Sequence, residues 1–232
     1  MKAAFLARLR EARLAARPVA VLTELSTGHQ FLYPDDNAPE PLVHAAKSAL
    51  DLDKASSLTV AGADWFVHPY NPPLRLIVVG AVHVAQALVP MAAGCGFAVT
   101  VVDPRGAFAT AERFGTDVVL RDEWPDDALQ ALAPDTRTAV VTLTHDPKLD
   151  DPALEVALRS PAFYVGALGS RKTHAKRLDR LREAGLDEAA LARIAAPVGL
   201  NIGAVTAPEI ALSVLAQIVA RRRGAALGGP TA

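Results

Sequence analysis

The sequence is poor in the residues that mark several common protein classes. Its 232 residues include one cysteine, Cys95, so no internal disulfide can form, and no cysteine and histidine spacing indicates a zinc site. Lysine and arginine number 24 against 25 aspartates and glutamates, which leaves a formal charge of -1 and no basic surplus for nucleic acid. These features predict a protein of the reducing cytoplasm that does not bind nucleic acid.

The sequence also lacks a long apolar run. No stretch approaches the roughly 18 apolar residues that span a bilayer, and residues 1–18 have no apolar segment of the kind found in signal peptides. The N-terminal segment instead has the spacing of an amphipathic helix, with Phe5, Leu9, Ala12 and Ala16 on one face. A basic transit peptide is the alternative. We expect no membrane association.

Hydrophobic residues make up 51% of the chain, enough for a sizeable core, and they are arranged in two patterns. Residues 1–72 predict a small α+β region, in which a helix is followed by a hairpin across 27–29, a helix over 39–52 and a hairpin across 61–63. Asn71-Pro72-Pro73 interrupts regular structure, because proline removes a donor and restricts the residue before it. We place a domain boundary there.

Residues 73–224 alternate short apolar runs with helical segments, and 225–232 form a glycine- and proline-rich tail that we expect to be flexible. The runs span 74–80, 97–103, 116–120, 137–143 and 162–168. Continuous Val, Ile and Leu runs joined by helices are typical of a parallel sheet buried on both faces. The fold class predicted is α/β, a doubly wound Rossmann-like parallel sheet with a small N-terminal α+β region. Ligands of such sheets bind beyond the carboxyl ends of the strands.

The first run ends in Gly80-Ala81-Val82-His83, where a dinucleotide fingerprint would have a second glycine in place of Val82. A β-branched residue suits neither a positive φ nor close approach of pyrophosphate, so a nucleotide loop and a structural turn both stay open. The second run ends at Asp103, which is suited either to ribose hydroxyls or to solvent, and Arg105 could meet a phosphate.

Later strand ends carry further polar groups. Thr144-His145-Asp146 would lie at the crevice mouth, with one of them capping the next helix as the alternative. Gly169-Ser170-Arg171 opens a basic helix, with Ser170 as its cap, and predicts a phosphate-binding turn in which backbone N–H groups, a hydroxyl and a guanidinium converge. Six Lys or Arg residues and one His fall within 171–182, and we expect most of them to form a solvated helix face or a partner contact.

A glycine-spaced loop over 196–203, which includes Asn201, either closes over the crevice or serves as a connection whose glycines take unusual backbone angles. Thr206 and Glu209 then predict a capping box for the last helix.

These segments resemble the XdhC/CoxI family of accessory proteins for molybdenum hydroxylases such as xanthine dehydrogenase and carbon monoxide dehydrogenase. The resemblance covers residues 74–223 in order and rests on LIVVGAVHVAQALVPMAAGCGFAVTVVDPR, AERF, VTLTHD, FYVGALGSRKTHAKRLDRLREAGL and IAAPVGLNIGAVTAPEIALSVLAQIVARRRG. It implies a Rossmann-like protein that binds molybdenum cofactor, protects it during sulfuration and delivers it to the apoenzyme. The implied partners are that apoenzyme and cofactor-assembly proteins, and a homodimer is compatible with the sequence.

Molybdopterin ends in a phosphate, and its dinucleotide form adds pyrophosphate and ribose, which Gly169 to Arg171 and Asp103 would hold. His83 occupies the position of the histidine in the family's Gly-Ala-Gly-His-Val. The candidate cofactor-binding residues are Gly80, His83, Asp103, Arg105, His145, Gly169, Ser170, Arg171 and Asn201.

The chain departs from the family in its N-terminal region, because residues 1–70 lack the usual Gly-Gly-Cys. Cys95 is expected at the end of a helix that runs away from the crevice, as a small packing residue. Thiolate chemistry is therefore not expected, and the sequence offers no nucleophile and base pair that would assign catalytic residues.

Three hypotheses follow. The first is a cofactor-binding chaperone for a molybdenum hydroxylase. The second is an NAD(P)-dependent oxidoreductase, with NAD(P) as the lesser cofactor candidate and His83 or His145 transferring a proton. The third is a non-catalytic scaffold that docks through the basic helix 171–182.

Overall fold

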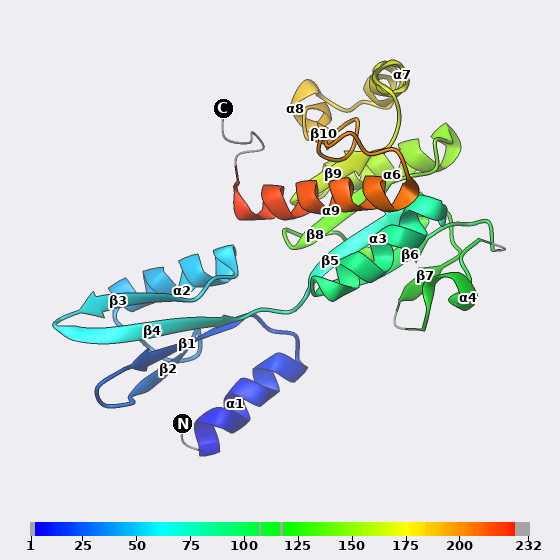
Figure 1. Cartoon of the computed structure of the whole chain (residues 1–232). Helices are drawn as coiled ribbons and strands as arrows, with labels where there is room; N and C mark the ends of the chain where they lie inside the picture. Colours follow the sequence, from blue (N-terminus) through cyan, green and yellow to red (C-terminus); the bar gives the residue numbers. More distant parts are fainter. Residues whose placement is uncertain (1–2, 107, 117, 226–232) are drawn as a thin grey trace. The chain divides into compact units, whose positions relative to one another are not determined.

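The computed structural model describes residues 3–106, 108–116 and 118–225, and the chain divides into two compact units between Pro72 and Pro73 (Figure 1). The first unit holds a four-stranded antiparallel sheet, and the second a six-stranded parallel sheet. The predicted α/β class, a Rossmann-like sheet with a small N-terminal α+β region, is confirmed. Most of the predicted tail, from residue 226 onward, lies outside the described residues.

The first unit packs one helix on each face of its sheet, which has the strand order β2-β1-β4-β3. Its elements are α1 (Ala3–Leu14), β1 (Val19–Glu24), β2 (Gln30–Tyr33), α2 (Glu40–Leu52), β3 (Ser56–Val60) and β4 (Ala63–Tyr70). Side chains of a strand alternate between faces, so Ala20 and Leu22 of β1 pack with α2 while Val19 and Val21 pack with α1. Both predicted hairpins and the helix over 39–52 are present.

The predicted apolar face of α1 is correct at three of its four residues. Leu9 and Ala12 are buried, and Phe5 packs against the same cluster. Ala16 is wrong, because α1 ends at Leu14 and Ala16 takes a φ of +50° outside the helix. Among the described residues, no helix is long and apolar enough to cross a membrane.

The second unit has the strand order β10-β9-β8-β5-β6-β7, and all its strand pairs are parallel. Its strands are β5 (Leu74–Val79), β6 (Phe97–Val102), β7 (Val119–Arg121), β8 (Thr138–Thr142), β9 (Tyr164–Ala167) and β10 (Ile194–Ala195). Its helices are α3 (His83–Gly94), α4 (Ala111–Phe114), α5 (Pro125–Leu132), α6 (Pro147–Arg159), α7 (Arg171–Glu183), α8 (Glu188–Leu191) and α9 (Ala207–Arg223).

Helices cover both faces of this sheet, as a doubly wound fold requires. Leu76 and Val78 of β5 contribute to a core shared with α3 and α9, which lie side by side in Figure 1, and Ile77 and Val79 contribute to a second core with α5 and α6. The order reverses at β5, which pairs with β6 on one side and β8 on the other. Because the strands are parallel, the turns after their carboxyl ends lie along one edge, and the reversal of order marks where a crevice forms there.

Candidate functional site

The carboxyl ends of β5, β6, β8 and β9 are followed by turns that carry most of the predicted site residues. Val79, the last residue of β5, pairs with Val102 of β6 and Thr142 of β8, and Thr142 pairs with Ala167 of β9. The turns that follow these four residues therefore begin at the same level of the sheet. In open α/β sheets this edge, at the reversal of strand order, is where ligands bind.

The turn after β5 is shaped by contact with the turn after β8. Gly80 has a φ of +106°, and a Cβ atom there would lie 2.5 Å from Cγ2 of Thr144. Val82 has a φ of -92° and a ψ of 175°, so the predicted conflict between a β-branched residue and a positive φ does not arise. Val82 is the N-cap of α3 and supplies no capping side chain, and the exposed His83 begins the helix.

Asp103, after β6, is fully buried and bonded within the protein. Its oxygens accept hydrogen bonds from Ala81 N at 2.8 Å, from Arg105 N at 3.0 Å, and from Nε and Nη2 of Arg105 at 2.8 and 2.7 Å. Burial raises the pKa of Asp103, but the hydrogen bonds from Arg105 and Ala81 outweigh it, and the net pKa lies below the ordinary value. The carboxylate thus orients Arg105, whose guanidinium carbon lies 4.6 Å from the centroid of the Phe108 ring.

The three polar side chains of the turn after β8 lie in different environments. Asp146 is the N-cap of α6 and accepts a hydrogen bond from Lys148 N at 2.9 Å, which is the helix-cap alternative for this turn. Thr144 donates its hydroxyl to Asp150 at 2.7 Å. His145 is exposed with a φ of +64°, an uncommon conformation for a residue with a side chain.

The turn after β9 has the geometry of an anion-binding helix start. Gly169 takes a φ of +138°, and Ser170 is the N-cap of α7, with its hydroxyl accepting from Thr173 N at 3.1 Å. Arg171 is the first residue of this 13-residue helix, and its side chain is exposed. The N-terminus of such a helix favours negative charge, because its first N–H groups have no acceptor within the helix.

A pocket of about 400 Å³ lies beside this turn and is bounded by the 196–203 loop. Arg171 and Asn201 both contribute to its lining, so the structure brings these two predicted residues together. The lining consists of Leu168, Arg171, Pro197, Val198, Gly199, Leu200, Asn201, Ile202, Gly203, Ala204, Ile210 and Ser213. Gly169 and Ser170 lie in the chain between Leu168 and Arg171, which both line the pocket. The other predicted residues belong to other turns and do not line the pocket; they are Gly80, His83, Asp103, Arg105 and His145.

Gln217 of α9 fixes the loop that walls the pocket. Its amide oxygen accepts from Gly199 N at 2.9 Å and from the Tyr164 hydroxyl at 2.5 Å, and its amide nitrogen donates to Gly199 O at 3.3 Å. Gly199 has a φ of +101°, and a Cβ atom there would clash with the Ser213 hydroxyl oxygen. The loop is therefore held closely against α9.

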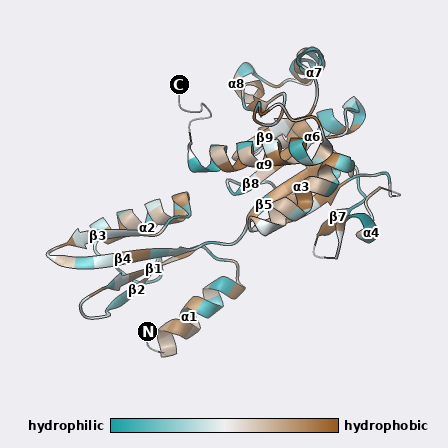
Figure 2. Ribbon diagram, in the orientation of Figure 1, coloured by the Kyte–Doolittle hydropathy of each residue, from teal (hydrophilic) through white to brown (hydrophobic). Residues whose placement is uncertain are grey.

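Sequence reasoning missed Gln217 and Tyr164, and it also missed Asp150 and Arg177, whose side chains are 1% and 2% exposed. The sequence does contain a signal that Asp150 is buried. Asp150 lies four residues before Leu154 and seven before Ala157, so helical spacing places it on the apolar face of α6. Arg177 is buried and is an exception to the solvated face expected for most of the basic residues of α7, a helix that Figure 2 shows as more hydrophilic than α3.

Cys95 is the C-cap of α3, at the opposite end from the crevice, as expected. Its predicted role as a packing residue is wrong, because its side chain is exposed. The α3 helix has 12 residues, so the thiol lies about 18 Å along the helix axis from the turn after β5.

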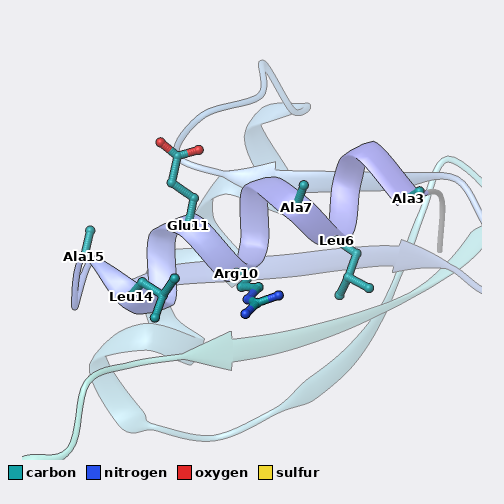
Figure 3. A pocket seen from close by; sticks show the side chains of 7 residues that line it. All are labelled: Ala3, Leu6, Ala7, Arg10, Glu11, Leu14 and Ala15. Carbon is teal, nitrogen blue, oxygen red and sulfur yellow. The ribbon is translucent and has the colours of Figure 1, made fainter.

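Another hollow, of about 730 Å³, lies along α1 in the first unit (Figure 3). It is lined by Ala3, Leu6, Ala7, Arg10, Glu11, Leu14 and Ala15. None of the predicted site residues lies there, and aliphatic side chains dominate its lining. The strand ends of the second unit, with their convergent polar groups, are the better candidate for a binding site.

Residues 76–218 match the XdhC Rossmann domain family. The molybdenum cofactor insertion chaperone PaoD of Escherichia coli is 35% identical over 153 residues, which cover 66% of this chain and 42% of PaoD. A probable xanthine dehydrogenase subunit of Bacillus subtilis is 32% identical over 206 residues, which cover 89% of this chain and 58% of that protein. The uncharacterized protein YqeB of Escherichia coli is 38% identical over 156 residues, 66% of this chain and 28% of YqeB.

A crystal structure of a xanthine dehydrogenase from Bacillus halodurans superposes with a TM-score of 0.71 at 25% identity, covering 95% of this chain and 67% of that one. The chain spans between 28% and 58% of the length of the three curated relatives. The family match extends over more than half of the chain and contains every turn described above. The chain therefore belongs to the XdhC family, whose Rossmann domain it carries over residues 76–218.

Proposed function

We propose that this protein binds molybdenum cofactor beside the start of α7 and delivers it to the apoenzyme of a xanthine dehydrogenase or carbon monoxide dehydrogenase type hydroxylase. The observation that carries the proposal is the pocket of about 400 Å³ that Arg171 and Asn201 both line next to the N-terminus of α7. PaoD, similar over 66% of the chain, is named a molybdenum cofactor insertion chaperone, which supports the same role.

The residues fit both chemical parts of the cofactor. A terminal phosphate suits the first N–H groups of α7 and the Arg171 guanidinium, which can bind it with charge-assisted hydrogen bonds. Leu168, Val198 and Ile210 offer apolar contact to a ring system, and the Asn201 amide can both donate to and accept from a heterocycle. The pocket volume falls within the range of about 300 to 1,000 Å³ that is usual for ligand sites.

The proposed role of the protein's own residues is binding and shielding. The cofactor itself would supply the molybdenum and sulfur chemistry that the recipient enzyme uses. Arg171 and the N-terminus of α7 would hold the phosphate, while Gln217 keeps the 196–203 loop in place as the pocket wall. Since Cys95 follows the far end of α3, no step through a thiolate is proposed.

The proposed partners are the recipient apoenzyme and the proteins that assemble the cofactor. The proposed location is the cytoplasm, because a chain with one cysteine cannot form an internal disulfide and therefore suits a reducing compartment.

The test is to purify the protein from a host that makes molybdenum cofactor and to measure released, oxidised pterin by its fluorescence. We expect a near-stoichiometric amount, and less than about a tenth of it in the Ser170→Ala/Arg171→Ala variant, because a charge-assisted contact to phosphate and the helix cap are lost. Arg182→Ala is the control, since Arg182 lies at the other end of α7 and pairs with Glu188. Absence of pterin from the unmodified protein would contradict the proposal.

A further inference from the structure

We propose that the buried Asp150–Arg177 pair ties the turn after β8 to the turn after β9 and so holds the anion-binding start of α7 in shape. Arg177 is then a positioning residue, which acts on a ligand through Leu168, and Asp150 joins Arg177 to the turn after β8 through Thr144. The ligand part of this inference rests on the proposed function, whereas the tie itself does not.

The pair forms a continuous chain of contacts between the two turns. Nη2 of Arg177 donates to the Leu168 carbonyl at 2.9 Å and lies 3.5 Å from Oδ2 of Asp150. Oδ1 of Asp150 accepts the Thr144 hydroxyl at 2.7 Å and the Thr144 N–H at 3.3 Å. Leu168 precedes Gly169 and Ser170, and Thr144 precedes His145, so each end of the chain of contacts fixes a crevice turn.

Several polar atoms of this buried pair lack the hydrogen bonds that would offset their loss of water. Among the described residues, Oδ2 of Asp150 and both Nε and Nη1 of Arg177 are buried without a hydrogen-bond partner. Burial also raises the pKa of Asp150 and lowers that of Arg177, so each charged form is disfavoured by its surroundings. Buried pairs of this kind add little stability over apolar residues, so we assign to this pair the role of fixing the geometry of the two turns.

The neighbouring Asp151–Arg180 pair provides a comparison. It joins the same two helices, α6 and α7, with Nη2 of Arg180 3.1 Å from Oδ1 of Asp151. Nε of Arg180 also donates to Oδ2 of Asp151. The Arg180 side chain is 37% exposed, and outside the pair it donates a hydrogen bond to the Lys176 carbonyl of its own helix. Arg180→Met therefore removes an ion pair between α6 and α7 without touching either turn.

The test is amide hydrogen exchange on the full chain. Asp146 N–H, bonded to the Thr144 hydroxyl, reports on the first turn, and Thr173 N–H, bonded to the Ser170 hydroxyl, reports on the second. We expect both amides to exchange at least about tenfold faster in Arg177→Met and at the unmodified rate in Arg180→Met. Unmodified rates in Arg177→Met, or equal acceleration in both variants, would overturn the proposal.

A double variant separates positioning from charge balance and guards against misfolding of Arg177→Met. Asp150→Asn/Arg177→Met leaves no unpaired buried charge, and its amide oxygen can still accept from Thr144, so thermal stability should recover. We expect Thr173 N–H to stay fast because the contact to Leu168 is absent, while Asp146 N–H returns to the unmodified rate. If Thr173 N–H recovers together with stability, the pair only balances charge and the tie is wrong.

Binding of inorganic pyrophosphate, measured by titration calorimetry, connects the tie to the ligand. The affinity should fall about tenfold in the double variant and stay unchanged in Arg180→Met. Arg171→Ala should weaken binding without accelerating exchange of Asp146 N–H. Failure of the unmodified protein to bind pyrophosphate would contradict the proposed anion site, and the exchange rates would still decide the tie.

Discussion

At the scale of single residues, the chemistry of the crevice depends on which polar groups already form hydrogen bonds within the protein. The sequence predicts that the Asp103 carboxylate meets either a ribose or solvent, but all of its hydrogen bonds come from Arg105 and Ala81. The group that this arrangement presents is Arg105, with 41% of its side chain exposed. Contact of Arg105 with a phosphate stays a prediction.

We expect Asp103→Asn to lower the free energy of unfolding by about 1 to 3 kcal/mol at pH 7, because hydrogen bonds to a buried charge are lost. The folded-state pKa of Asp103 is below its ordinary value, so the stabilisation is present above the unfolded pKa and is lost as pH falls through the folded pKa. The difference between variant and unmodified protein should therefore shrink below about pH 4. Urea unfolding at several pH values measures it.

Asp122→Asn, at an exposed position, is the control and should leave the unfolding curves unchanged. A difference for Asp103→Asn that stays constant down to about pH 3 would contradict the assignment of the charge.

The polar and glycine residues of each turn could be predicted from the sequence, because they follow recognisable buried runs. Their partners could not. Arg177 is one of six basic residues in a hydrophilic helix, and only the packing of α7 on α6 distinguishes it from exposed neighbours. Gln217 has no local signal either, since its partners Gly199 and Tyr164 come from elements far apart in the chain.

At the scale of helices and strands, prediction succeeded where burial is continuous. The Val, Ile and Leu runs correspond to β5, β6, β7, β8 and β9, with boundaries shifted by a few residues. Strand β10 has two residues, too few to produce a pattern, and was missed. The predicted caps at Ser170 and Thr206 are confirmed, because both depend only on local sequence.

The N-cap position of α3 has no capping side chain. Val82 has the extended backbone of an N-cap but no oxygen to accept from the first turn. We expect Val82→Thr, which keeps the shape and adds a hydroxyl, to raise the free energy of unfolding by about 0.5 to 1 kcal/mol. Thermal and urea unfolding measure the change, and Val82→Ala serves as the variant without a hydroxyl. Equal stability of the Thr and Ala variants would argue against a free cap.

At the scale of the whole molecule, the described core clusters each lie within one of the two units. We expect residues 73–232, expressed alone, to unfold in one cooperative urea transition, because two buried layers flank their sheet. Residues 1–72 alone should be only marginally stable, since a chain of that size buries about 60% of its surface. Circular dichroism of both fragments and the full chain tests this; loss of cooperativity in 73–232 would contradict it.

The reversal of strand order could be predicted as a property of doubly wound sheets, but the neighbours of each strand depend on contacts between distant segments. That is why the crevice could be expected at the carboxyl ends, with closure by the 196–203 loop as one alternative, whereas the pairing of this loop with the start of α7 in one pocket could not be predicted.

The six-stranded sheet ends on each side in its shortest strands, β10 with two residues and β7 with three. An incoming strand from another protein would find few backbone groups to pair with at either border. Short borders also protect the sheet from pairing with other copies when cellular concentrations are high. We therefore expect any recognition of another protein by this domain to use side chains on its helices and loops and not the borders of its sheet.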